Sequence, residues 1–221
     1  MGRRAAWAFA LTLAGPLVAA AAMGGFRMGW WSYGVAWNGL TLLAALPLTV
    51  IGAAAAIYAI MLAIKLPKLA GAAALGAALV SGLTLALFIK VLLIDVSAAG
   101  PDVSTDVTDP PGFPTALVAL GAPGGAPAMD GTCAVEAYPS QSAPGSAGYA
   151  LQQAGFEVAD LSVGRAVGSR TGPWFGSTWD AAIRIRPGRT DIRVAARDPG
   201  QDRGEACRLA LHIAKGLKPG S

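Results

Sequence analysis

Hydrophobic positions are distributed very unevenly along the 221-residue chain. Its first hundred residues hold three apolar stretches, and each is long enough for a helix that crosses a bilayer, which takes about 20 residues. These stretches lie at about residues 5–24, 35–64 and 69–94. The pattern predicts a region of about three transmembrane helices, residues 1–95, followed by a soluble domain, residues 96–221.

The pattern of the second half changes to short alternating runs. Residues 96–147 are rich in Pro, Gly, Ser and Asp, and we expect an ordered linker there with at most one short strand, near residues 115–120. A helix over residues 146–154 would end at Gly155, and a last helix would cover residues 205–217. Between them the pattern predicts strands at residues 156–163, 165–170, 179–186 and 190–196. The predicted fold class is therefore α+β, with an antiparallel sheet and flanking helices.

The last two predicted strands form a hairpin around Pro187-Gly188-Arg189. Alternation divides their side chains between two faces. One face is predicted to be buried and contains Ile183, Ile185, Ile192, Val194 and Ala196. The other is predicted to be exposed and contains Arg184, Arg186, Asp191 and Arg193.

Basic residues predict the orientation in the membrane. Arg3-Arg4 precede the first apolar stretch and Lys65 and Lys68 separate the second from the third, so both clusters lie on one side, which we predict to be cytoplasmic. The opposite loop contains an aromatic belt made of Trp30, Trp31, Tyr33 and Trp37. The soluble domain would then lie in the periplasm of a bacterium, with the anchor in the inner membrane.

The first and third apolar stretches each have a second interpretation. Residues 3–22 also resemble a secretory signal peptide, although the length of the run and Gly15-Pro16 favour an uncleaved helix. Residues 71–82 are rich in Gly and Ala, which indicates close helix packing in the same bundle or against another membrane protein. Lys90 lies near the outer boundary, where its ammonium would reach the headgroups with Asp95 as a partner.

Composition narrows the possible partners. The chain is 54% hydrophobic and 14% charged, and its net charge of +4 comes largely from residues that flank the apolar stretches, which argues against a nucleic-acid partner. In the second half, residues 95–160 contain acids but no Lys or Arg, whereas Lys and Arg predominate from Arg165 onward. These two segments would attract each other if they pack together. The basic hairpin face would otherwise meet lipid phosphates or an acidic partner, or it would be exposed to water, and we favour water.

Few residues suggest chemistry. His212 is the only histidine, and with two cysteines it gives no zinc spacing. Cys133 and Cys207 would form a disulfide in an oxidising compartment, worth about 4 kcal/mol, or remain two buried thiols. Asp102, Asp106 and Asp109 lack the spacing of a calcium loop. We expect no metal, no cofactor and no catalytic set.

Several short blocks resemble the domain of unknown function 1499 (DUF1499) family. The string DVSTDVTDPPGF resembles its opening signature, and residues 138–139, 174–186, 191–197 and 202–208 resemble later blocks in the same order. The matching signature residues are Thr105, Asp106, Asp109, Pro110, Pro111 and Phe113. This chain departs from the family pattern at Trp179, at Ala195-Ala196 and near Glu205. The resemblance covers about residues 100–217 and implies a fold and a membrane anchor but no reaction.

Three hypotheses of function follow. The leading one is a non-enzymatic membrane protein whose periplasmic domain binds a partner protein or an envelope component. The second is a protein that binds lipid or a small ligand. The third is an enzyme of unknown reaction, for which polar residues must converge in one cleft. The candidates for such a cluster are Asp180, Arg184, Arg193, Asp202 and Arg208.

Overall fold

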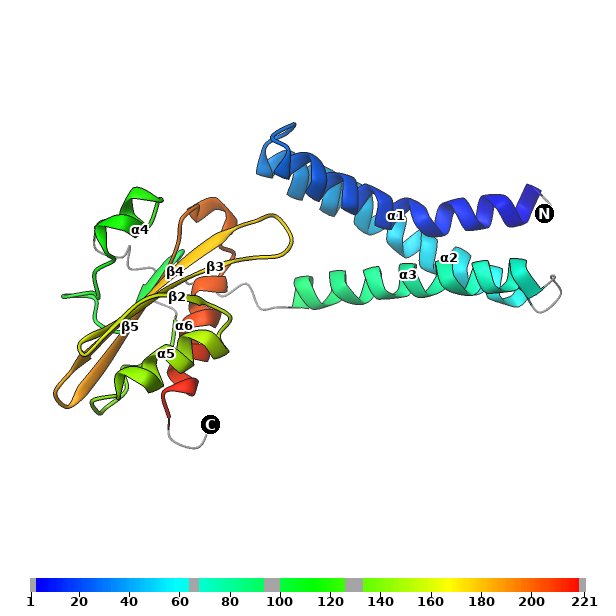
Figure 1. Cartoon of the computed structure of the whole chain (residues 1–221). Coiled ribbons are helices and arrows are strands. Elements are labelled where there is room, and N and C mark those ends of the chain that lie inside the picture. Colours follow the sequence, from blue (N-terminus) through cyan, green and yellow to red (C-terminus); the bar gives the residue numbers. More distant parts are fainter. Residues whose placement is uncertain (1–2, 64–67, 94–99, 126–132, 219–221) are drawn as a thin grey trace. The chain divides into compact units, whose positions relative to one another are not determined.

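The computed structural model of the chain describes residues 3–63, 68–93, 100–125 and 133–218. The chain divides into two compact units, Met1–Ile94 and Asp95–Ser221, beside the boundary expected from hydropathy. Figure 1 shows the helical first unit and the mixed second unit. Lys65, which separates the second and third apolar stretches, and Asp95, the predicted partner of Lys90, lie outside the described residues.

The described residues of the first unit are helical except for a short loop after Arg27. It contains α1 (Arg3–Arg27), the π-helix η1 (Val35–Ala45), α2 (Leu46–Ala63) and α3 (Lys68–Leu93). The predicted second apolar helix is thus a π-helix that continues directly into an α-helix. Each of α1, α2 and α3 contacts the other two, so they form one bundle.

Two helical segments among the described residues are long and apolar enough to cross a membrane, Ala10–Arg27 and Val35–Tyr58. The apolar part of α3, Leu75–Lys90, is shorter. By length and composition, two of the three predicted spans are therefore present as candidates. Lys90 is exposed on α3.

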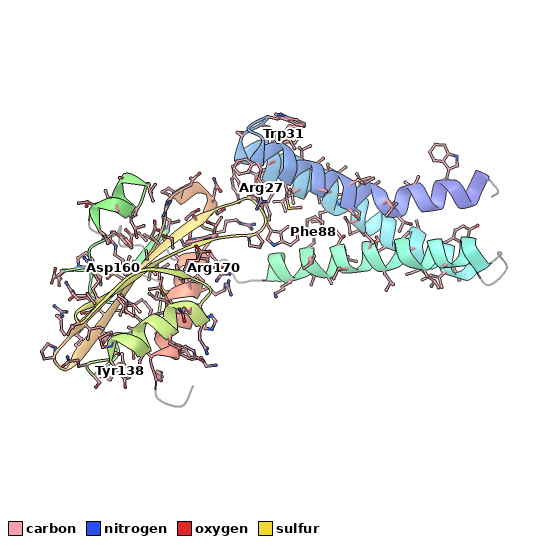
Figure 2. All side chains as sticks on the ribbon, in the orientation of Figure 1. Arg27, Trp31, Phe88, Tyr138, Asp160 and Arg170 are labelled. Atoms are coloured by element: carbon pink, nitrogen blue, oxygen red, sulfur yellow. A yellow bond between two sulfur atoms is a disulfide. The ribbon has the colours of Figure 1, made fainter. Side chains whose placement is uncertain are left out.

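Glycines allow the helices of this bundle to approach closely. A Cβ atom at Gly15 would lie 2.2 Å from the Thr49 hydroxyl oxygen, so only glycine fits where α1 meets α2. A Cβ atom at Gly52 would lie 3.0 Å from the carbonyl oxygen of Leu11. In the loop after α1, the Trp31 indole N–H donates to the Ala22 carbonyl at 3.0 Å, and Figure 2 labels this tryptophan.

The second unit is built on a five-stranded antiparallel sheet with the order β1-β5-β4-β3-β2. Its strands are β1 (Asp102–Ser104), β2 (Glu157–Ser162), β3 (Arg165–Thr171), β4 (Thr178–Arg186) and β5 (Arg189–Ala196). The helices α5 (Pro144–Gln153) and α6 (Glu205–Gly216) cover one face, while the short α4 (Thr115–Ala119) lies on the other (Figure 1). The unit is therefore an α+β domain, as predicted.

Local sequence explains the boundaries of several elements. Pro144 occupies the first turn of α5, where its missing N–H needs no partner, and Gly155 follows that helix with a φ of +82°. Gly188 has a φ of +74° in the turn between β4 and β5. The Asp202 carboxylate accepts the N–H groups of Gly204 and Ala206 at 2.8 Å each, which caps the start of α6.

The predicted buried face of the hairpin is confirmed. Ile183, Ile185, Ile192, Val194 and Ala196 all belong to the main core, together with apolar residues of α5 and α6. The largest of the fully buried side chains include Leu151, Leu209 and Ile213. Burying such side chains contributes about 2 kcal/mol each before the cost of ordering them.

Two details of the predicted linker are wrong. Residues 115–119 form the helix α4 and not a strand, and Leu117 of this helix packs in one cluster with Val167 and Ala182 of the sheet. The strand of this region is β1, which pairs Asp102 with Ala195 of β5. Its three residues are too few to show alternation, and its partner is far away in the sequence.

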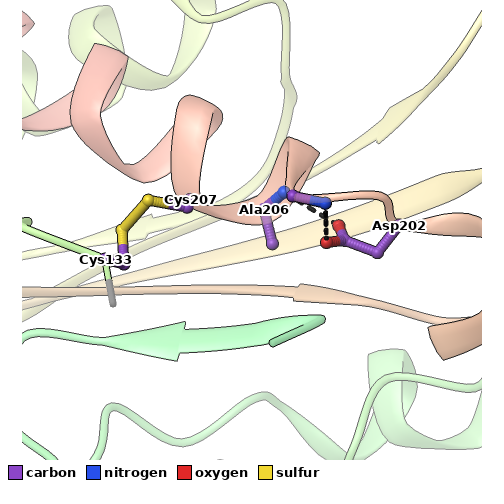
Figure 3. The surroundings of a disulfide bond; sticks show 5 residues. Cys133, Asp202, Ala206 and Cys207 are labelled. Atoms are coloured by element: carbon purple, nitrogen blue, oxygen red, sulfur yellow. Dashed lines mark hydrogen bonds between the residues drawn. A yellow bond between two sulfur atoms is a disulfide. The ribbon is translucent and has the colours of Figure 1, made fainter. Parts of the chain in front are cut away.

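The predicted pairing of Cys133 with Cys207 is confirmed by a disulfide in the structure. Figure 3 shows this bond beside the first turn of α6, with Asp202 and Ala206 near it. The bond fixes the chain before Tyr138 to α6. Farther along this segment, Tyr138 forms a bridge to Thr190, which places Tyr138 against the start of β5.

Candidate functional site: the charged face of the sheet

Charged residues gather on the sheet face that α5 and α6 leave uncovered. Alternation along β4 and β5 turns every second side chain to this face, and residues 105–125, which we call the strap, lie across it. The face contains three groups of ion pairs, at Arg184, at Arg193 and at Asp180. Their partners come largely from β1 and from the strap.

The first group joins the strap to the hairpin end of β4 and β5. Its members are Arg184, Arg186, Arg189, Asp106, Asp109 and Asp191. Arg184 contacts the carboxylate of Asp109 at 2.9 Å and that of Asp106 at 3.3 Å, and Arg186 contacts Asp106 at 3.0 Å. The Asp109 N–H, together with the Arg186 guanidinium, lowers the pKa of Asp106 from 3.8 to about 2.

The second group holds Arg193 in the interior. Its guanidinium donates to both carboxylate oxygens of Asp102, at 2.9 and 2.6 Å, and to the carbonyl oxygens of Pro111 and Gly125. It also lies over the ring of Phe113, 5.0 Å from the centroid. Arg193 is only 2% exposed, and these partners satisfy a buried charge that would otherwise be very unfavourable.

The third group joins β3, β4 and the end of β5. Asp180 is fully buried and accepts two hydrogen bonds from Arg197, both at 2.8 Å, and one from the Ser169 hydroxyl at 2.5 Å. Asp180 raises the pKa of the Arg197 guanidinium through these hydrogen bonds. The arrangement leaves the carboxylate of Asp180 surrounded by donors.

The prediction of an exposed charged face is wrong. Asp191 is fully buried and Arg193 nearly so, because the strap covers them. Leu117 and Ala122 of the strap pack on Val167 and Ala182 between the ion pairs. The acidic segment and the basic strands therefore pack together, which is the first of the three alternatives that their charges allowed.

The five residues considered for a polar cluster do not converge. Asp180, Arg184 and Arg193 share one face but contact three different sets of partners. Asp202 accepts the indole N–H of Trp179 at 2.8 Å, and Trp179 belongs to the core on the opposite face. Burial raises the pKa of Asp202.

Arg208 lies apart from all of these residues. It forms an ion pair with Glu205 on the exposed side of α6, and that contact raises the pKa of Arg208. His212 is exposed farther along the same helix. The five residues therefore do not form the single polar cluster that the enzyme hypothesis required.

The described residues contain no group of three or more His, Cys, Asp or Glu side chains that could hold a metal ion. The three aspartates Asp102, Asp106 and Asp109 instead face arginines. The negative charges of these aspartates are neutralised by arginines of the same domain. The ion pairs on this face therefore hold the strap against the sheet.

Comparison with known proteins gives no relative. No protein-family model, no curated protein and no solved structure matches this chain. The resemblance to the domain of unknown function 1499 family stays a prediction that rests on its short blocks. The structure nevertheless gives each of those blocks a physical role.

Most residues of the string DVSTDVTDPPGF that we singled out hold the strap against the sheet. The Thr105 hydroxyl accepts the N–H of Ile192 at 3.0 Å and donates to Asp191 at 3.3 Å. Asp106 and Asp109 bind arginines of β4, Pro110 is half-buried, the carbonyl of the buried Pro111 accepts from Arg193, and Phe113 lies under that guanidinium. The signature is thus accounted for by intramolecular contacts.

Residues at which the predicted resemblance fails also make structural contacts. Trp179 stands where the pattern has an acid, and its indole lies in the core and binds Asp202. Ala195 and Ala196 are both buried on β5, between the neighbouring strands β1 and β4, and their side chains point to opposite faces of the sheet.

Two residues that bind Asp180 on this face were not predicted from the sequence. Arg197 and Ser169, the partners of Asp180, were not singled out, because they lie in different segments and show no common motif. The only sequence signal of such contacts was the separation of acids before Asp160 from arginines after it.

Proposed function

We propose that this chain is an integral protein of a bacterial inner membrane, with about three membrane-spanning helices, a cytoplasmic N-terminus and a periplasmic domain that binds a partner protein. One observation supports the membrane part above all. In the first unit many large apolar side chains face outward, with Leu43 78% and Leu79 75% exposed, while Thr49 and Ser81 are fully buried. Such an arrangement is favourable in lipid and unfavourable in water.

Other features support the proposed orientation. Aromatic rings cluster after α1, where Tyr33 stacks with Trp37 and lies edge-on to Phe26, as expected for a membrane–water interface. The disulfide between Cys133 and Cys207 favours an oxidising compartment for the soluble domain. The charged face is occupied by the strap, so a partner must use another surface.

The corner formed by α5 and the β2–β3 turn is the surface that we propose for the partner. Tyr149 is 57%, Leu161 48% and Val163 80% exposed there. Leu161 lies beside α5, because a Cβ atom at Gly148 would be 3.3 Å from its methyl group. Exposed apolar side chains close to one another are typical of protein-binding surfaces.

The anchor is tested by fractionating cells that express the full chain. The protein should stay with membranes after alkaline carbonate extraction. A cysteine-free reporter enzyme that works only in the periplasm should be active when it is fused after Ser221. Recovery of the chain in the soluble fraction would contradict the proposal.

The partner is tested with a photo-reactive amino acid at Val163, and at Leu211 of α6 as an exposed control. A defined adduct with a second protein is expected at Val163 and not at Leu211. The adduct should disappear in Leu161→Glu. Equal labelling at both positions, or labelling that survives Leu161→Glu, would contradict this binding surface.

A further inference from the structure

The loop between β3 and β4 presents a large aromatic side chain. It consists of residues 172–177, with the sequence Gly-Pro-Trp-Phe-Gly-Ser, and no charged residue occurs between Arg170 and Asp180. Trp174 is 42% exposed, whereas the next residue, Phe175, is buried. The loop thus inserts one ring into the domain and turns the other outward.

Hydrogen bonds give this loop a defined shape. The Gly172 N–H donates to the Ser177 carbonyl at 2.7 Å, which closes the loop at its base. The Ser177 hydroxyl donates to the Gln201 side chain at 2.8 Å, which ties the loop to the segment before α6. Gly176 has a φ of +73°, a conformation that favours glycine. The exposure of Trp174 is therefore built into the loop.

The loop lies at the end of the sheet where the chain enters the domain. Thr171 and Thr178 pair at the ends of β3 and β4, and the Ala196 N–H at the end of β5 donates to the Pro101 carbonyl at 2.8 Å. Figure 1 shows the β4–β5 turn at the opposite end. Trp174 and the entry of the chain at Pro101 therefore share one end of the sheet.

The covalent chain restricts where this end can lie relative to a membrane. In sequence, α3 ends at Leu93 and β1 begins at Asp102. A fully extended segment of that length reaches at most about 30 Å, at about 3.5 Å per residue. The thickness of a headgroup layer lies well within this reach. Tryptophan favours that layer, because its ring is apolar while its N–H can still bind polar groups.

We propose that residues 172–177 form a membrane-binding loop, in which Trp174 inserts into the headgroup layer of the bilayer that holds the N-terminal helices. The inference rests on the proposed membrane anchor. It adds a second contact with lipid, made by the soluble domain itself. That contact would restrict the domain to one orientation, with the β2–β3 turn directed away from the membrane and toward a partner.

The test uses the full chain in nanodiscs that contain phosphatidylglycerol and phosphatidylcholine, the latter with or without bromine atoms near the headgroup end of the acyl chains. The difference in emission between the wild type and Trp174→Phe isolates the fluorescence of Trp174 from that of the other five tryptophans. We expect brominated lipid to quench this difference and iodide in solution to leave most of it. Quenching by iodide without quenching by bromine would overturn the proposal.

A matched control moves the tryptophan to the far end of the sheet. In the Trp174→Phe background, Val163→Trp places the ring in the exposed β2–β3 turn. We expect iodide to quench this ring and brominated lipid to have no effect. Equal quenching by bromine at both positions would show that the domain lies on lipid without using the loop, which also overturns the proposal. A chain that fails to enter nanodiscs would instead contradict the anchor.

Discussion

At the scale of single residues, the carboxylate of Asp180 depends on one arginine. Because Asp180 is fully buried and takes two hydrogen bonds from Arg197, Arg197→Ala would leave a buried charge without its cation. We expect this variant to lower the free energy of unfolding of the domain by about 3 kcal/mol. Pulse proteolysis of the full chain in detergent and urea measures it. Arg208→Ala, which removes an exposed pair with Glu205, should cost less than about 1 kcal/mol, and equal losses would contradict the argument.

Asp106 makes the stability of the domain depend on pH. Its pKa is about 2 in the folded chain and 3.8 without these contacts, so the unfolded chain binds the proton more readily. The stabilising contribution is therefore complete above pH 3.8 and is lost as the pH falls toward 2. The urea concentration at which half of the protein is unfolded should fall between pH 3.8 and pH 2, and we expect this fall to be smaller in Asp106→Asn. An unchanged pH dependence in the variant would contradict this role.

At the scale of elements, the crossing of α1 and α2 depends on Gly15. A Cβ atom there would overlap Thr49, whereas a Cβ atom at Gly76 of α3 would meet nothing within 4 Å. We expect Gly15→Ala to lower the temperature at which the detergent-purified protein loses its monodisperse peak in size exclusion. Gly76→Ala should leave it unchanged or raise it, because alanine stabilises a helix by up to about 1 kcal/mol relative to glycine. The reverse order would show that the helices do not cross there.

Some helices and strands could be predicted from the sequence and others could not. The β4–β5 hairpin and α5 were predictable, because Pro187-Gly188 and Gly155 mark their ends and alternation marks the strands. The strand β1 was not, since three residues show no period and the pairing with β5 is not local. The π-helix η1 was also missed, because its apolar residues satisfy the pattern of an ordinary helix.

At the scale of the whole molecule, the disulfide closes a loop across most of the soluble domain. Cys133 and Cys207 are separated by 74 positions, so reduction gives the unfolded chain much more freedom. We expect the double variant Cys133→Ser, Cys207→Ser to lose about 4 kcal/mol of unfolding free energy. Dithiothreitol should destabilise the wild type to a similar extent and leave the double variant unaffected. An unchanged wild type under dithiothreitol would contradict this contribution.

The division into an apolar half and a polar half was also predictable, because helices that cross a bilayer need long runs without charge. The burial of the charged face was not. Asp106 and Asp109 occur in a segment rich in proline, which gives no local sign that it crosses a sheet. Only the contrast between an acidic segment and later arginines indicated the contact, and that contrast fits a solvated surface equally well.

The position of β1 at the edge of the sheet favours one order of folding for the domain. The strands β2 to β5 follow one another through short connections, whereas the pair formed by Asp102 and Arg193 spans 91 positions. Closing so long a loop is slow compared with forming a hairpin. During synthesis, Asp102 leaves the ribosome long before its partner Arg193 has been added to the chain. We therefore expect β1, which is synthesised early, to join the sheet last.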